Sequence, residues 1–408
     1  MPNKIQIPGF KILKLLQRRT LLGRLLLVGA SVLFALTIAE VALRLAGFSY
    51  FNPYTYDAEL GSTLRPNAEG WWTKEGFAYV KINSRGFRDY EHALQKPKDT
   101  IRIAILGDSF SEALQLSIEN TFWSVMRRQL ESALEPRHKQ VEVLNFGVSR
   151  FSTARELIML RRHVWQFDPD VVVLQFTPGN DVKDNSRRLT GDSEAFPYFE
   201  YKDGALVLDD SLLKNRNTHF TFRLRQSLAG PLTWLRSHSR VVGLVYSLRE
   251  SYFSPPRAAP SGQSRPDIEP GLDDDSYRYP VNRDWTDAWL VTEKLIVQMR
   301  DEVQAKGAKF LVVTATKGVQ VAPDPELRAA YMKKLEVTTM AYPDDRIKEL
   351  GAREGIEVLV LAPSFLEFAE HNQIYLHGFG ATKGQGHWNE AGHQLAGELI
   401  ANKLLKML

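Results

Sequence analysis

The sequence predicts an α/β fold, in which helices cover both faces of a parallel β-sheet. Three runs, at residues 101–106, 141–147 and 168–181, are mostly apolar, and each is followed by or ends in turn-forming residues. A strand that is buried on both faces is apolar throughout, whereas a half-exposed strand alternates between apolar and polar residues. Segments with helical spacing separate the three runs, and such alternation is typical of a parallel sheet.

The helical segments are bounded by residues that favour helix ends. Residues 120–136 place apolar side chains on one face, with Asn120 or Thr121 as the expected cap and Pro136 as the stop. Residues 152–167 are also expected to be helical. Towards the C-terminus the pattern continues, with helices near 285–305 and 326–355, strands at 309–316 and 356–362, and a last helix from about Asn389.

The α/β pattern is interrupted once. Residues 185–284 contain polar loops, an amphipathic stretch and a segment rich in proline, serine and aspartate at 254–276. We predict that they form an insertion, disordered in part, within one domain made of residues 99–184 and 285–408. Residues 48–98 are rich in aromatic and turn-forming residues, and we expect them to form a connecting segment that packs on this domain.

The N-terminus predicts a membrane anchor. Six lysines and arginines, and no acidic residue, precede Leu25, and a long apolar stretch follows. Its uncharged part is shorter than the roughly twenty residues that cross a bilayer, but Arg24 can snorkel and apolar residues continue to Phe48. We predict a basic cytoplasmic tail at 1–19, a single-pass anchor at 20–47 in the cell membrane, and a main domain on the periplasmic or extracellular side. A cleaved signal peptide and a buried helix of a soluble protein are the alternatives.

Composition excludes several classes of function. The chain has no cysteine, so it has no disulfide, no zinc–thiolate site and no cysteine nucleophile. The net charge of +4 comes from the N-terminal tail, and the rest of the chain is slightly acidic, which does not fit a nucleic-acid-binding protein. The histidines near the C-terminus have no metal-ligand spacing. We therefore expect no metal and no other cofactor.

Three turns follow the three apolar runs and bring polar groups to one edge of the predicted sheet, because the carboxyl ends of parallel strands meet there. Ser109 offers a hydroxyl, which becomes a nucleophile only when a base removes its proton and donors accept the charge on the attacked carbonyl oxygen. The backbone N–H groups of Ser109 and Gly147 and the amide of Asn180 are the candidate donors of this oxyanion hole. His387, just before the last helix, is the candidate base. Asp108 is expected to accept backbone N–H bonds in its turn.

The three turns and the segment around His387 resemble the conserved motifs of the SGNH superfamily of hydrolases, also called GDSL-like. Four residues match its motifs in order, namely Ser109, Gly147, Asn180 and His387. The resemblance covers about residues 99–190 and 285–408. It implies a flavodoxin-like three-layer fold, a serine nucleophile, a histidine base, and oxyanion donors from the serine N–H, the glycine and the asparagine.

One departure from the family pattern concerns the acid that orients the histidine. The family usually has an aspartate three residues before its histidine, and this chain has Gly384 there. Either a backbone carbonyl orients His387, in a Ser-His dyad, or a distant acid such as Asp181 or Asp184 does so.

The anchor and the segments at 82–89 and 386–393 also look like anchored SGNH proteins associated with bacterial exopolysaccharide and cell-envelope acyl chemistry. We expect an esterase that removes ester-linked acyl groups, with O-acetyl foremost, from a glycan or another envelope substrate through an acyl-serine intermediate. The alternatives are an O-acyltransferase that modifies an exported polysaccharide and a catalytically silent glycan-binding or scaffold subunit. The expected partners are the lipid bilayer, the substrate, and envelope or polysaccharide-export proteins.

Two pairs of tryptophans are candidates for a sugar-stacking surface. They are Trp71 with Trp72, and Trp285 with Trp289. We expect core packing or interfacial anchoring for them instead.

Overall fold

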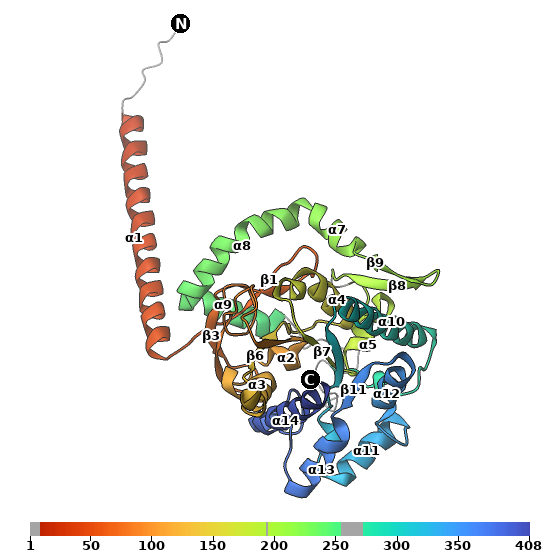
Figure 1. Cartoon of the computed structure of the whole chain (residues 1–408). Helices are drawn as coiled ribbons and strands as arrows, with labels where there is room; N and C mark the ends of the chain where they lie inside the picture. Colours follow the sequence, from red (N-terminus) through yellow and green to blue (C-terminus); the bar gives the residue numbers. More distant parts are fainter. Residues whose placement is uncertain (1–8, 193–194, 254–271) are drawn as a thin grey trace. The chain divides into compact units, whose positions relative to one another are not determined.

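The computed structural model describes residues 9–192, 195–253 and 272–408, which fall into two compact units (Figure 1). One unit comprises residues 1–50 and 226–263, and the other comprises residues 51–225 and 264–408. The larger unit contains the predicted α/β domain. Residues 254–271 of the predicted insertion lie outside the described residues.

The larger unit is built on a parallel sheet of five strands. The strands, in chain order, are β5 (Thr100–Leu106), β6 (Gln140–Asn145), β7 (Val171–Phe176), β10 (Lys309–Thr314) and β11 (Glu357–Val360). Their order across the sheet is β11-β10-β7-β5-β6, and all neighbouring strands are parallel. Numbered along the chain this order is 2-1-3-4-5, the flavodoxin-like arrangement. The predicted fold class is therefore confirmed.

Helices cover both faces of this sheet. One face packs on α4 (Thr153–Arg162), α10 (Arg283–Ala305) and α12 (Tyr342–Glu354), and the other on α3 (Phe122–Leu134), α13 (Ala362–Asn372) and α14 (Glu390–Met407). Along β5, Ile103 and Ile105 enter one core and Ala104 and Leu106 enter the other, because successive side chains of a strand point to opposite faces. Trp285 and Trp289 are buried in the first core, as expected.

The ends of two helices follow the predicted capping residues. The Thr121 hydroxyl accepts a bond from Ser124 N at the start of α3, and the Asn389 side chain accepts one from Gly392 N at the start of α14. The prediction of a single helix near 326–355 is wrong. This segment forms two helices, α11 (Pro325–Leu335) and α12, because Glu336 adopts a left-handed conformation with φ of 55° that ends α11.

The remaining elements precede the sheet along the chain or lie between its strands in sequence. Residues 51–98 form two small antiparallel pairs, β1 (Tyr54–Thr55) with β2 (Thr63–Leu64) and β3 (Glu69–Trp72) with β4 (Ala78–Lys81). Short helices follow two of the sheet strands, α2 (Ser109–Glu112) after β5 and α5 (Asp181–Asp184) after β7. Between β7 and α10 lie α6 (Arg187–Thr190), the hairpin β8 (Tyr198–Lys202) and β9 (Ala205–Asp209), α7 (Ser211–Thr218), α8 (Phe220–His238) and α9 (Arg240–Phe253).

The smaller unit contains α1 (Gly9–Leu45), whose part from Gly23 to Leu45 is apolar and long enough to be a membrane span or a signal sequence. The end of this helix contacts α9. The Glu40 carboxylate accepts bonds from the Ser239 hydroxyl and from the N–H groups of Arg240 and Val241, so it caps the start of α9.

Candidate active site

Ser109 and His387 meet at the carboxyl edge of the sheet. Ser109 is the first residue of α2, three residues after the end of β5 at Leu106, and His387 lies in the loop between α13 and α14. The Ser109 Oγ atom lies 2.7 Å from Nε2 of His387. At this distance a neutral imidazole, protonated at Nδ1, accepts the hydroxyl hydrogen at Nε2. The pair therefore has the geometry of a nucleophile and its general base.

A third residue, Glu75, orients the imidazole from the other side. Its Oε2 atom lies 2.5 Å from His387 Nδ1, and its Oε1 atom accepts a bond from the His387 backbone N–H at 2.9 Å. Burial raises the pKa of Glu75, but the hydrogen bonds from His387 and its charge outweigh burial, and the net shift is downward. A carboxylate at Nδ1 fixes the tautomer in which Nε2 faces the serine.

The expectation that a backbone carbonyl, Asp181 or Asp184 orients His387 is thereby corrected. The Asp181 carboxylate accepts a bond from Thr177 N at 2.8 Å, in the turn after β7. Burial and repulsion from Glu156 hold the pKa of Asp181 well above its ordinary value. The carboxylate that contacts His387 Nδ1 belongs to Glu75 instead.

Glu75 reaches the site because two glycines leave room for it. It lies in the turn between β3 and β4, 312 residues before His387. A Cβ on Gly386 would come within 2.4 Å of Glu75 Oε1, and a Cβ on Gly76 within 2.4 Å of the Gln115 carbonyl oxygen. Both glycines have positive φ, 84° and 66°, which other residues rarely adopt.

The three expected oxyanion donors converge on the turn that holds Ser109. Gly147 lies against α2, where a Cβ would approach Ser111 Cβ to 2.5 Å, and its N–H donates to Asn145 Oδ1 at 3.1 Å. The Asn180 amide donates one hydrogen to Asp108 Oδ2 at 2.8 Å. An amide carries two hydrogens, so Asn180 keeps a second one to donate to a substrate oxygen. Ser109 contributes the N-terminus of α2.

Asp108 holds this turn in place, as expected. Its Oδ1 accepts the N–H of Phe110 at 3.0 Å, which caps α2, while its Oδ2 accepts the Asn180 amide. Burial raises the pKa of Asp108, and the bonds from Asn180 and Phe110 oppose that shift. Asp108 therefore links the nucleophile turn to the Asn180 amide and orients that amide.

The segment at residues 83–89 contacts the helix α2, which begins at Ser109. The buried Arg88 guanidinium donates to the carbonyl oxygens of Glu112, Ala113 and Leu116, just after Ser109 on the chain. Asn145 at the end of β6 donates to the carbonyls of Arg88 and Ser111. These bonds fix the end of β6 relative to α2. They therefore position Gly147 relative to Ser109.

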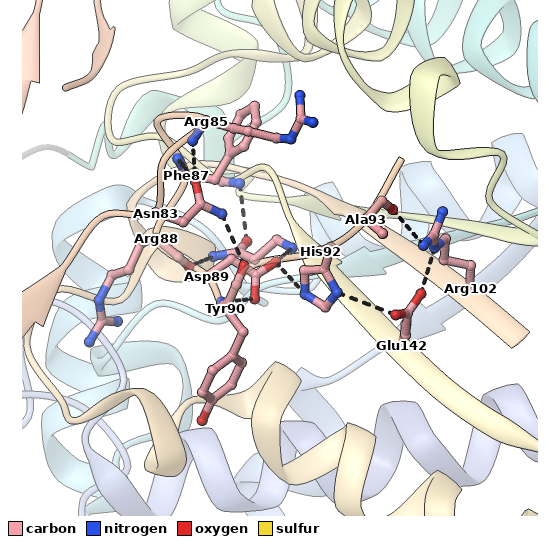
Figure 2. Close-up of polar contacts among 12 residues, drawn as sticks. Asn83, Arg85, Phe87, Arg88, Asp89, Tyr90, His92, Ala93, Arg102 and Glu142 are labelled. Carbon is pink, nitrogen blue, oxygen red and sulfur yellow. Dashed lines mark hydrogen bonds and ion pairs between the residues drawn. The ribbon is translucent and has the colours of Figure 1, made fainter. Parts of the chain in front are cut away.

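A chain of charged groups ties this segment to the sheet (Figure 2). Asp89 accepts the Asn145 N–H at 2.7 Å and lies 3.4 Å from His92. On the other side of His92, the Glu142 carboxylate accepts the Arg102 Nε–H at 2.7 Å. Burial lowers the pKa of His92, but Asp89 and Glu142 outweigh burial and raise it overall. The segment is thus attached to β5 and β6 by buried polar contacts.

The other histidine of the 386–393 segment has a structural position. His393 is fully buried in α14, and its Nδ1 accepts the N–H of Phe122 at 3.1 Å. Burial lowers the pKa of His393 to about 3, so it is neutral. Within the described ranges, no group of three or more acidic or histidine side chains could hold a metal ion.

Comparisons with known proteins find likeness only at the level of solved structures. No family model matches the sequence, and no curated protein matches it. An acetyl xylan esterase is 14% identical with a TM-score of 0.39, over 74% of this chain and all of its own. A lipase/acylhydrolase from Enterococcus faecalis is 12% identical with a TM-score of 0.35, over 76% of this chain and 97% of its own.

A lipolytic protein of the G-D-S-L family from Desulfitobacterium hafniense is 10% identical, with a TM-score of 0.34, over 74% of this chain and 98% of its own. These structures are, by their names, ester hydrolases. Likeness at this level leaves the function of the present site to be argued from its own geometry.

Proposed function

We propose that the protein is an SGNH-type serine esterase that removes acyl groups, O-acetyl foremost, from a glycan of the cell envelope. The observation that carries the proposal is the continuous chain of contacts from Ser109 Oγ through His387 to Glu75. A nucleophile, a base and an orienting acid in contact are the requirements of acyl transfer through a covalent intermediate.

In the proposed reaction, Ser109 Oγ attacks the ester carbonyl carbon while His387 Nε2 takes the hydroxyl proton. Glu75 stabilises the imidazolium that forms. The carbonyl oxygen becomes an oxyanion, which accepts hydrogen bonds from the second amide hydrogen of Asn180 and from the Ser109 N–H. The Gly147 N–H donates to Asn145 Oδ1 in this structure and would have to give up that bond to become the third donor. The bond to the alcohol then breaks, and His387 gives its proton to the leaving oxygen. Water, activated by His387, attacks the acyl-serine and releases the carboxylic acid.

The same residues would serve an O-acyltransferase if a sugar hydroxyl replaced the water. The catalytically silent alternative was based on the missing aspartate before His387, and Glu75 fills that role in the geometry described above. A nucleophile probe and an analysis of products separate these three functions.

A fluorophosphonate probe should label the wild-type protein, and Ser109→Ala should abolish labelling. An unlabelled wild type would contradict esterase and acyltransferase alike. With an acetylated sugar and an unacetylated acceptor glycan, release of acetate at the same rate with and without the acceptor supports hydrolysis. Acetylated acceptor as the product would instead support transfer.

We also propose that α1 anchors the protein in the cell membrane, with the α/β domain on the outer side. The support is the apolar surface of residues 23–45, none of which is buried within the described residues, and the basic tail before it. The full chain should stay in the membrane fraction through an alkaline carbonate wash. Its release by that wash, or a mature chain that begins after residue 45, would contradict the anchor.

A further inference from the structure

The hairpin that carries Glu75 also carries a group of exposed rings, which we call the aromatic platform and which consists of Trp71, Phe77 and Tyr79. Their side chains are 43%, 69% and 42% exposed. The rings of Trp71 and Phe77 are stacked, with centroids 4.7 Å apart and planes inclined by 19°, and Tyr79 meets Trp71 edge-on at 5.3 Å. Large apolar side chains that cluster in water commonly mark a binding surface.

The strand register explains why these rings share one face. Trp71 pairs with Tyr79, and the next pair along the hairpin is Trp72 with Ala78. Because side chains alternate along a strand, Trp72 packs inward on a small core that contains Val80, while the platform faces outward. The inward face supports the platform and holds it rigid.

The platform and Glu75 belong to the same hairpin. Phe77 is two residues after Glu75, and Glu75 contacts both the ring and the backbone of His387. The turn at residues 73–77 is packed closely at Gly76, where a Cβ would lie 2.4 Å from the Gln115 carbonyl oxygen. The platform is therefore joined through Glu75 to the residue that activates Ser109.

The charges on the same face favour a sugar over a lipid or an acyl chain. Glu69 and Lys81 form an ion pair of 3.7 Å beside the rings, and Lys81 Nζ lies 5.9 Å from the centroid of Tyr79. A hydrocarbon covering this face would desolvate the pair without replacing its hydrogen bonds. A sugar ring stacks its C–H face on an aromatic ring and offers hydroxyls to neighbouring charged groups.

We propose that the aromatic platform binds the glycan chain whose acyl ester Ser109 attacks, by stacking on a sugar near the acylated one. This proposal rests on the proposed esterase function and names a binding subsite for the same substrate. It assigns the platform to substrate selection rather than to the chemical step.

The test compares two substrates in the full-length protein. One is p-nitrophenyl acetate, which has no sugar. The other is the best hydrolysed of three chemically acetylated polymers, xylan, glucomannan and alginate. For Trp71→Ala and Phe77→Ala, the ratio of kcat/KM on the polymer to kcat/KM on p-nitrophenyl acetate should fall about tenfold, which corresponds to about 1.4 kcal/mol. Trp71→Phe, which keeps a ring, should restore most of the ratio.

Tyr279→Ala is the matched control, because Tyr279 is another exposed aromatic residue, with 78% exposure, away from the hairpin. Its ratio should equal that of the wild type. An unchanged ratio in both platform variants would overturn the proposal, as would a wild type that cleaves p-nitrophenyl acetate and none of the polymers. A wild type inactive on every ester would instead count against the esterase itself.

A different observation supports a second inference, which concerns the smaller unit. In this unit the end of α1 holds α8 and α9 through several bonds. Glu40 caps α9, Arg44 donates to the His238 carbonyl at 2.9 Å, and the Tyr50 hydroxyl donates to Glu250 at 2.6 Å. Wherever the end of α1 lies in a bilayer, the ends of α8 and α9 lie at the same depth.

These two helices have the composition of an interfacial surface. Residues 226–249 contain three arginines and no acidic residue. Leu228, Leu232 and Leu235, spaced to share one face of α8, are 41–48% exposed, and Trp234 beside them is 61% exposed. Exposed apolar side chains next to arginines suit the boundary between acyl chains and anionic headgroups.

We also infer that α8 and α9 lie in the outer interface of the bilayer and bind anionic lipids, in addition to the anchor α1. Trp234 reports on this directly, because the smaller unit contains no other tryptophan. The full chain is reconstituted in vesicles of phosphatidylcholine and phosphatidylglycerol that carry brominated acyl chains. The fluorescence of Trp234 is the difference between the wild type and Trp234→Phe.

Brominated lipid should quench this difference signal by more than half, and replacing Leu228, Leu232 and Leu235 together by serine should remove most of the quenching. In Trp234→Phe, the remaining fluorescence comes only from the tryptophans of the larger unit. The quenching of that fluorescence serves as the internal control. An unquenched Trp234 in vesicle-bound protein would overturn this inference. Protein that does not stay with the vesicles would count against the anchor instead.

Discussion

At the scale of single residues, Glu75 decides which nitrogen of His387 faces the serine. Without a carboxylate at Nδ1, the imidazole can place a hydrogen on Nε2 and lose its function as a base. Glu75→Gln should therefore lower kcat on p-nitrophenyl acetate by about 10²–10⁴-fold, as for the acids of other triads, and leave the fold intact. Glu326→Gln, an exposed carboxyl in another part of the chain, is the control and should keep wild-type activity. Comparable activity in both variants would contradict a triad.

A substitution at Gly386 tests the contact between Glu75 and His387 from the side of the histidine loop. An alanine there would put its Cβ 2.4 Å from Glu75 Oε1 and would also be strained at φ of 84°. Gly386→Ala should reduce kcat at least tenfold, because the carboxylate has to move away from His387. Gly307→Ala, at φ of 77° with open space around it, carries the strain without the collision. If both variants lose the same activity, strain alone explains the loss.

His393 makes stability depend on pH in a predictable direction. Its folded-state pKa of about 3 is below the ordinary value of 6.5, so the unfolded chain binds a proton that the folded chain does not. Its contribution to stability is complete above pH 6.5 and falls by about 1.4 kcal/mol per pH unit as the pH drops towards 3. His393→Gln removes this term.

Melting temperatures of the wild type and His393→Gln should therefore converge as the pH falls from 7 to 4. For Asn372→Ala, at an exposed position without a titratable side chain, the difference from the wild type should stay constant. Parallel curves for His393→Gln and the wild type would show that the buried imidazole does not titrate as the structure requires.

At the scale of elements, the 83–89 segment positions α2. The Arg88 guanidinium satisfies three carbonyl oxygens at and beyond the end of this four-residue helix, which is too short to be stable by itself. Arg88→Met should lower the free energy of unfolding by about 3 kcal/mol or more, because buried carbonyls lose their donors. The folded fraction should also lose activity, since Ser109 begins the same helix.

Arg85→Met is the control, because Arg85 lies in the same segment but is exposed to solvent. Denaturant unfolding and fluorophosphonate labelling of the two variants separate stability from the alignment of Ser109. Arg88→Met with wild-type stability and labelling would mean that α2 is held by its other contacts.

Elements with strong local patterns were predictable from the sequence. Ser109 follows an apolar strand, and His387 precedes a helix capped by Asn389, so both positions relative to the sheet edge could be inferred. The order of strands followed from the resemblance to a known family. The break between α11 and α12 was not predicted. Glu336 ends α11 in a left-handed conformation, and glutamate is not a residue type that favours this conformation.

The role of Glu75 as the acid that orients His387 could not be predicted, because its neighbours in the sequence do not distinguish it from other acidic residues. Its role arises from a turn between two short strands that meets a loop 312 residues later. The glycines at 76 and 386 were the available sign, since each permits a close approach, but a glycine does not identify its neighbour. Asp181 and Asp184 were named only as distant acids, and the Asp181 carboxylate is used within its own turn, where it accepts the N–H of Thr177.

At the scale of the whole molecule, two kinds of membrane contact should be separable. If α1 is the anchor and α8 and α9 bind the lipid surface, a chain that begins at residue 51 loses the first contact and keeps the second. We expect it to bind phosphatidylglycerol vesicles at low ionic strength and to leave them in high salt or carbonate, because the attraction of arginines to headgroups is screened. Vesicle sedimentation over a range of salt concentrations measures this.

The same shortened chain with Leu228, Leu232 and Leu235 changed to serine should stay in the supernatant at every salt concentration, while it cleaves p-nitrophenyl acetate as fast as the unchanged shortened chain. The activity follows because these leucines belong to the smaller unit, and Ser109, His387 and Glu75 all belong to the larger one. Vesicle binding that survives the leucine changes would place the lipid contact on another surface. Loss of esterase activity in the shortened chain would mean that the larger unit needs α1 to hold its site.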